Sequence, residues 1–191
     1  WIALGLNAAM FAVEIVGSLR SGSVSLLADA IDFFGDAANY GLSLAVLSMA
    51  LTVRARAALL KAAAMAGFGV FVLGRALWSA WNGVAPEALT MGAVALLALA
   101  VNVAVAWLLY RHREGDANRR SVWLCSRNDA LGNLAVALAA LGVAGSGAAW
   151  PDLLVAAGMA ALALASAWSV MRQALVELRA SRLAPGTFAQ D

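Results

Sequence analysis

The chain has 191 residues, of which 63% are hydrophobic and 13% charged, with a formal net charge of +2 and a mean hydropathy of +0.83. A soluble domain carries roughly 25% charged residues, so this composition excludes a soluble globular protein. The basic residues lie at the ends of apolar runs, which argues against nucleic-acid binding, and the single cysteine, Cys125, excludes a disulfide within the chain.

Six continuous apolar runs follow one another, and each is long enough to cross a bilayer, which takes about 20 helical residues. Spans in lipid must be helices or closed barrels, and these runs do not alternate, so the sequence predicts an all-α polytopic membrane protein. The expected spans are residues 1–19, 24–51, 57–81, 89–110, 121–143 and 150–176. They form one transmembrane domain over residues 1–191. Because the chain begins at Trp1, we expect residues upstream of it; no signal peptide is visible.

Basic residues gather on one side of the expected bundle, which sets its orientation. They are Arg54, Arg56, Lys61, Arg111, Arg113, Arg119, Arg120, Arg172, Arg179 and Arg182. On the opposite side of the expected bundle, the basic residue is Arg20 and the acidic residues are Glu87 and Asp152. We therefore expect both termini in the cytoplasm and an integral protein of the inner membrane of a bacterium.

Three aspartates, Asp29, Asp32 and Asp36, stand inside the second span. A charge near the middle of a membrane helix costs about 2.5–3.5 kcal/mol even on the lenient insertion scale, so three of them indicate function. Positions i and i+4 share a helix face, so Asp32 and Asp36 direct four oxygens toward one point. That suits a divalent cation; an intramembrane hydrogen-bond network is the alternative. Three roles remain open for Asp29: a position near the pore, a structural role, or a part in a proton relay.

The fifth span repeats this geometry, because Cys125, Asp129 and Asn133 are spaced by four residues. If the two spans pack together, Asp32, Asp36 and Asp129 with either Cys125 or Asn133 make the four ligands of a tetrahedral transition metal. The alternative role for Asp129 is to neutralise the charge of Arg127. A buried cysteine often packs as a small hydrophobe, and Asn133 equally fits support of the ligands or a helix–helix hydrogen bond.

At these residues the chain resembles the cation diffusion facilitator family over nearly its whole length. The family's early signature corresponds to Asn7, Glu14, Gly17 and residues 21–30, and its second-helix ligand pair falls on Asp32 and Asp36. The fifth-helix pair, usually His and Asp, falls on Cys125 and Asp129, after Asn118. Trp150, Pro151 and Asp152 resemble the entry into the sixth helix.

The resemblance implies a transporter rather than an enzyme, a homodimer in the lipid bilayer that exports divalent metal in exchange for protons. Zn, Co, Cd, Mn or Fe would be the substrate, and no prosthetic group is expected. Three features depart from the family pattern. Cys125 replaces the usual His, the loop after the fourth span has only His112, and the cytoplasmic domain that normally follows the sixth helix is absent before Asp191.

Charge suggests how transport would work. Crowded carboxylates repel one another in a low dielectric, so at least one should hold a proton, and a divalent cation must displace protons to gain its ligands. If the site opens alternately to the two sides, this competition becomes antiport. The alternatives are a metal-gated channel and a membrane metal sensor, although one four-ligand cluster fits a carrier better than the charge rings of a channel.

Overall fold

The computed structural model describes residues 1–46, 51–110 and 117–183, but not the side chains of residues 117–127 nor of several others near the gaps. Its elements are helices α1 (Ile2–Ser21), α2 (Val24–Val46), α3 (Leu51–Asn82), α4 (Ala88–Tyr110), α5 (Ala117–Ser146) and α6 (Trp150–Leu183). The part of the chain described contains no strand. All helices except α2 include a segment long and apolar enough to cross a membrane. The predicted all-α polytopic class is confirmed.

Several helices extend beyond the expected spans. Helix α3 begins at Leu51 rather than at 57, and α6 continues to Leu183 rather than ending at 176. A helix can continue past the hydrocarbon core, about 30 Å thick, into water, so helix ends do not mark the limits of the membrane. Helix α2 ends at Val46, and the residues just after it, 47–50, lie outside the described part.

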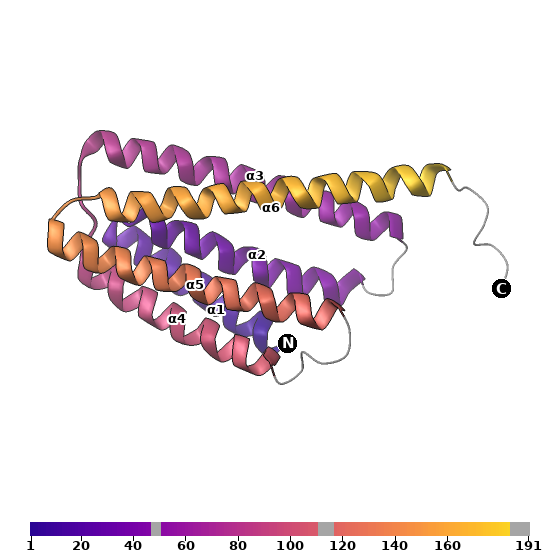
Figure 1. Ribbon diagram of the computed structural model, residues 1–191, viewed down its shortest axis with the longest axis horizontal. Helices are drawn as coiled ribbons and strands as arrows, with labels where there is room; N and C mark the ends of the chain where they lie inside the picture. The colour runs from indigo at the N-terminus through magenta and orange to yellow at the C-terminus, as the bar shows by residue number, and fades with distance from the viewer. Residues whose placement is uncertain (47–50, 111–116, 184–191) are drawn as a thin grey trace.

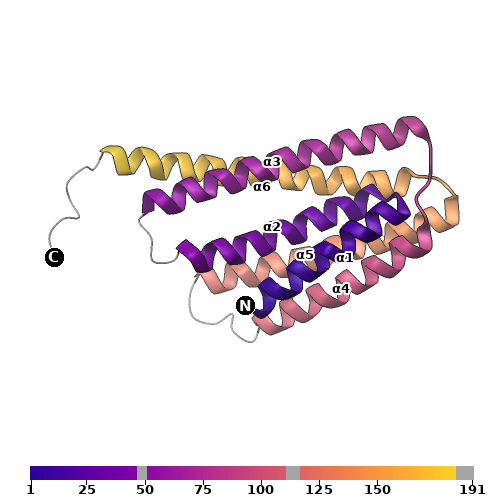
Figure 2. The ribbon, with the colours of Figure 1, turned by 180° about the vertical axis from the view of Figure 1, so that it is seen from behind.

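The helices divide into two groups in space. Helices α3 and α6 lie side by side along one edge, and α1, α2, α4 and α5 form the rest of the bundle (Figures 1 and 2). Gly69 of α3 permits the close approach to α6, since a Cβ there would lie 2.9 Å from Cγ of Leu164. Within the described residues, α2 is the only helix that contacts all five others.

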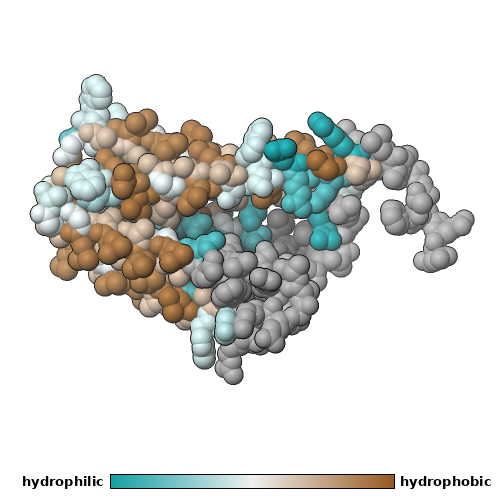
Figure 3. Space-filling model, in the orientation of Figure 1, coloured by the Kyte–Doolittle hydropathy of each residue, from teal (hydrophilic) through white to brown (hydrophobic). Residues whose placement is uncertain are grey.

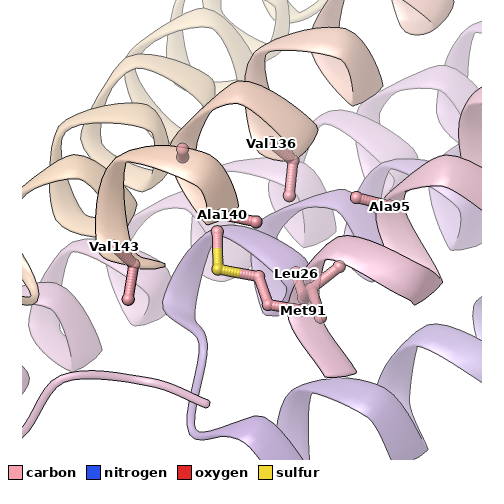
Figure 4. Close-up of a cluster of buried hydrophobic side chains, with 7 residues drawn as sticks. Leu26, Met91, Ala95, Val136, Ala140 and Val143 are labelled. Carbon is pink, nitrogen blue, oxygen red and sulfur yellow. The ribbon is translucent and has the colours of Figure 1, made fainter. Parts of the chain in front are cut away.

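Each of the three hydrophobic clusters includes part of α2. Leu26 packs with Met91 and Ala95 of α4 and with Val136 of α5 (Figure 4). A second cluster joins Val24 and Ala28 of α2 to α3 and α6, and a third joins Phe33 of α2 to α1 and α4. Apolar contacts with α1, α3, α4, α5 and α6 therefore hold the first part of the helix that carries the three aspartates.

The outer surface of the bundle is apolar. Large side chains such as Leu77, Leu131 and Leu162 are well exposed, and hydrophobic residues cover much of the face shown in Figure 3, while hydrophilic ones gather toward the extended ends of α3 and α6. An apolar exterior is what helices in contact with lipid tails require.

Candidate metal-binding site

A tight turn sets the start of α2. Gly22 adopts φ 73°, in the left-handed region that glycine enters without strain, and the N–H of Ser23 bonds the hydroxyl of Ser21 at 3.2 Å. Helix α2 then begins at Val24. Asp29, Asp32 and Asp36 follow at helical spacings of three and four residues, which stack them on neighbouring turns of one side of the helix.

Helices α2 and α5 meet through their carboxyl groups. The side chain of Asp129 on α5 lies close enough to those of Asp32 and Asp36 on α2 to interact with both. Its oxygen Oδ2 is buried and has no hydrogen-bond partner among the described residues. An ionised carboxylate only accepts hydrogen bonds, so two carboxyls can bond to each other only when one of them holds a proton. A hydrogen bond between any two of these acids would therefore require a shared proton.

The aspartates do not yet form a complete ligand shell. Among the side chains that the structure describes, no three from His, Cys, Asp and Glu gather closely enough to hold one metal ion. Helices α2 and α5 touch over a small area compared with α1 and α2, and Asp32 remains accessible. Asp129 thus pairs with each of the two α2 aspartates, and binding one ion with all three requires them to draw together.

Of the two candidates for a fourth ligand, the structure describes the side chain of Asn133 but not that of Cys125. Asn133 is 0% exposed, and in the part of the chain that the structure describes neither its Oδ1 nor its Nδ2 has a hydrogen-bond partner. An unpaired buried polar group costs about 1–3 kcal/mol, so this amide has unused capacity to bind. The side chain of Cys125 lies outside the described residues, and its assignment stays a prediction.

A second acidic pair lies deeper in the bundle. Glu14 of α1 is 0% exposed and stands beside the 1% exposed Asp29, while neither oxygen of Glu14 has a partner in hydrogen-bonding geometry within the described residues. The sequence showed each residue as an acid inside a span, but no spacing rule connects positions on two helices, so their proximity was not predicted.

The electrostatic influence of one cation on the site was not predicted from the sequence. The sequence grouped Lys61 with the basic residues that flank a loop, but it stands inside α3, half-buried, and its positive charge acts on Asp32 and Asp36. The only hint in the sequence was its position within an apolar run. Arg75, the other cation well inside α3, is exposed.

Known proteins share this sequence pattern. The chain matches the cation efflux transmembrane domain over residues 1–179. It is similar to the zinc transporter ZitB of Escherichia coli (strain K12), with 28% identity over 189 residues, 92% of this chain and 60% of that protein. It is also similar to the metal cation efflux system protein CzcD of Cupriavidus metallidurans, with 24% identity over 186 residues, 91% of this chain and 59% of that protein. The chain thus spans about three fifths of the length of these curated relatives.

Proposed function

The chain belongs to the cation efflux transmembrane domain family, and from this premise we propose that it exports divalent transition metal cations from the cytoplasm in exchange for protons, by alternating access. Family membership confirms the resemblance drawn from the motifs. The relatives named above are transporters, and we assign transport rather than catalysis to this chain as well, with the metal as cargo and no prosthetic group.

The observation that carries the proposal is the closeness of Asp129 to both Asp32 and Asp36. It brings together carboxyl oxygens from α2 and α5, two helices that are far apart in the chain. Within the described residues, α2 contacts every other helix. Three carboxyls inside an apolar bundle are costly, and a divalent cation offsets that cost when it binds them. We propose these three as the metal ligands, with Cys125 or Asn133 as the fourth.

Proton exchange follows from the chemistry of the same groups. Carboxyls that bond to each other hold at least one proton between them, whereas a metal requires deprotonated ligands. An arriving ion would therefore release protons, and protons arriving from the opposite side would release the ion. If α2 and α5 separate at one side of the membrane at a time, this competition transports metal against the proton flow.

The ligand set decides which metal is favoured. Three carboxylates with an amide oxygen form a hard site that suits Mn²⁺ or Fe²⁺, whereas a thiolate shifts the preference toward Zn²⁺, Co²⁺ or Cd²⁺. The relative ZitB is described as a zinc transporter, which makes Zn²⁺ the first ion to test. We propose the inner membrane of a bacterium as the location, because the relatives come from bacteria.

Transport by purified protein in proteoliposomes tests the proposal. We expect Zn²⁺ uptake that saturates at low metal concentration, rises with an opposing proton gradient, and is accompanied by proton movement measured with a pH-sensitive dye. Uptake that does not saturate and ignores the proton gradient would support a channel instead. Metal binding without any uptake would support a sensor.

We also propose a homodimer formed through the membrane helices. Small residues let helices approach closely in lipid, and α3 and α6 contain many of them. Mass measurement in several mild detergents and in lipid nanodiscs tests this. A monomer in all of them would contradict the proposed dimer and leave the transport proposal intact.

A further inference from the structure

A cavity of about 490 Å³ lies between α2 and α3, beside the aspartates. Ile31, Gly35 and Ala38 line it from α2, and Lys61 and Ala64 line it from α3. Among the lining residues that the structure describes, Lys61 is the only charged one. An ammonium group in an apolar cavity is costly unless a negative charge lies near.

Asp32 and Asp36 lie beyond the edge of this cavity, since neither is among its described lining residues. Asp32 follows the lining residue Ile31 in the chain, and Asp36 follows the lining residue Gly35. Neighbouring residues of a helix point in directions about 100° apart around its axis. A lysine has a flexible four-carbon stem that can reach around such an edge. The charge of Lys61 acts on both carboxyls, so the cation and the two acids share one electrostatic environment.

Aromatic packing holds α3 at this distance from α2. Phe34 of α2 meets Phe68 of α3 edge to face, with ring centroids 5.8 Å apart and an interplanar angle of 83°. Phe34 also contacts Phe11 of α1, with centroids 5.3 Å apart. The reach of Lys61 toward the aspartates is therefore a consequence of how the two helices are packed.

We propose that Lys61 is a tethered counter-cation of the metal site, which offsets the charge of Asp32 and Asp36 while no metal is bound and weakens the hold on a bound ion so that it can leave. The proposal rests on the transport function proposed above. Lys61 is a positioning and affinity-setting residue and not a ligand, because an ammonium group has no lone pair to donate to a metal.

Coulomb's law gives the direction of each effect. A unit positive charge stabilises nearby carboxylates and repels a divalent cation twice as strongly as a monovalent one at the same distance. Removing the charge should therefore tighten binding of Zn²⁺, by about tenfold, and slow its release. The metal-free protein should become less stable, since the acids lose their counter-cation, and the zinc-loaded protein should change little.

The test compares Lys61→Met and Lys61→Gln with the wild-type chain, each purified whole. We expect a Zn²⁺ dissociation constant about tenfold lower in a competition assay with a chelating dye. In proteoliposomes KM should fall and the maximal rate should fall with it. The melting temperature should drop without metal and recover with Zn²⁺. A merely structural role would lower stability in both states and would not tighten binding.

Two further variants make the comparison specific. Lys61→Arg keeps the charge and should retain near wild-type affinity. Arg75→Met removes a cation from the same helix at an exposed position, fourteen residues and about 21 Å along α3 from Lys61, and should leave the Zn²⁺ affinity unchanged. Should Arg75→Met tighten binding as much as Lys61→Met, the effect would be one of net charge and the proposal would be overturned.

Unchanged or weaker Zn²⁺ binding by folded Lys61→Met or Lys61→Gln protein overturns the inference. If neither variant folds, the double variant Lys61→Met with Asp36→Asn restores the charge balance; its folding supports the pairing, and its failure to fold overturns it. The proposed function has a separate readout. The proposed function fails, and the inference with it, if the wild-type protein neither binds nor transports metal. If transport requires Asp36 but is unchanged when Lys61 is substituted, only the inference about Lys61 is overturned.

Discussion

The carboxylate of Asp152, in the first turn of α6, accepts a hydrogen bond of 2.6 Å from the hydroxyl of Ser23, which immediately precedes α2. It also accepts bonds from the Ser25 hydroxyl at 2.6 Å and from the N–H groups of Val24 and Ser25 at 2.8 and 3.1 Å. The first N–H groups of a helix have no partner within it, so a residue of α6 caps the helix that carries the aspartates. Asp152 itself is 1% exposed.

Asp152→Ala should therefore destabilise the protein by roughly 2–4 kcal/mol, because it leaves several buried donors of α2 without an acceptor. Asp152→Asn should cost less, since the amide oxygen still accepts. Thermal unfolding in detergent measures both. As a control, Glu177→Ala removes a carboxylate from the exposed part of α6, where it accepts a bond from Gln173, and should cost no more than about 0.5 kcal/mol. Equal losses for Asp152→Ala and Glu177→Ala would contradict the capping role.

The sequence predicted those features that depend on neighbours along the chain. Long apolar runs identify membrane helices because the bilayer demands them, and the spacing of Asp32 and Asp36 places both on one face. The cap of α2 by Asp152 joins residues 128 apart. No periodicity encodes such a contact, because it depends on how α2 and α6 pack against each other.

The same limit applies within the site. Asp129 could be placed beside Asp32 and Asp36 only on the condition that α2 and α5 pack together, which the sequence suggested by a shared pattern. Lys61 carried no such pattern, since a lone lysine near a helix end is most simply read as a loop residue. Its relation to the aspartates arises from the crossing of α2 and α3, which is set by contacts such as that of Phe34 with Phe68.

Removing any one of the three site aspartates should abolish transport. Asp32→Ala, Asp36→Ala and Asp129→Ala each take away two of the ligand oxygens, and each should leave expression and folding intact, because the apolar clusters around α2 do not involve them. Zn²⁺ uptake into inverted vesicles is the measurement. Glu177→Ala, which removes an acid outside the site, should transport normally. Normal uptake by Asp36→Ala protein would end the proposed ligand assignment.

Glu87 should make stability depend on pH at the acid end. The Thr90 side chain and the N–H groups of Thr90 and Leu89 bond its carboxylate at the start of α4 and lower its pKa below the ordinary value of 4.5. A depressed pKa in the folded state stabilises the protein above the unfolded value, and this contribution is lost as the pH falls through the folded pKa.

The matched variant for this effect is Glu87→Gln, which keeps an acceptor and removes the charge. Its melting temperature should lie slightly below that of the wild-type chain at about pH 7, and the two should converge as the pH falls below the folded pKa of Glu87. The difference should also shrink in high salt, because the carboxylate is exposed. A gap that stays constant through this fall in pH would show that the charge of Glu87 contributes nothing.

The last prediction separates the two candidates for the fourth ligand. If the sulfur of Cys125 binds the metal, Cys125→Ser should weaken binding of Zn²⁺ and Cd²⁺ much more than that of Mn²⁺, because a hydroxyl is a poor soft ligand. Cys125→His restores the commoner family residue and should keep or raise Zn²⁺ transport. Bound metal should also protect the thiol from alkylation, since a coordinated sulfur is not free to react.

If Asn133 is the ligand instead, Asn133→Ala should destroy binding of every metal while Cys125→Ser leaves all affinities unchanged. The buried amide, whose two polar atoms have no partner among the described side chains, then completes a site of oxygens alone, which prefers Mn²⁺ over Cd²⁺. Stability adds an independent readout. Removing an unsatisfied amide should leave the metal-free protein as stable as before or more so, whereas the loss of a ligand should abolish the rise in melting temperature that metal causes. An Asn133→Ala protein that still gains stability with Mn²⁺ and Zn²⁺ would exclude the amide and leave Cys125 as the fourth ligand.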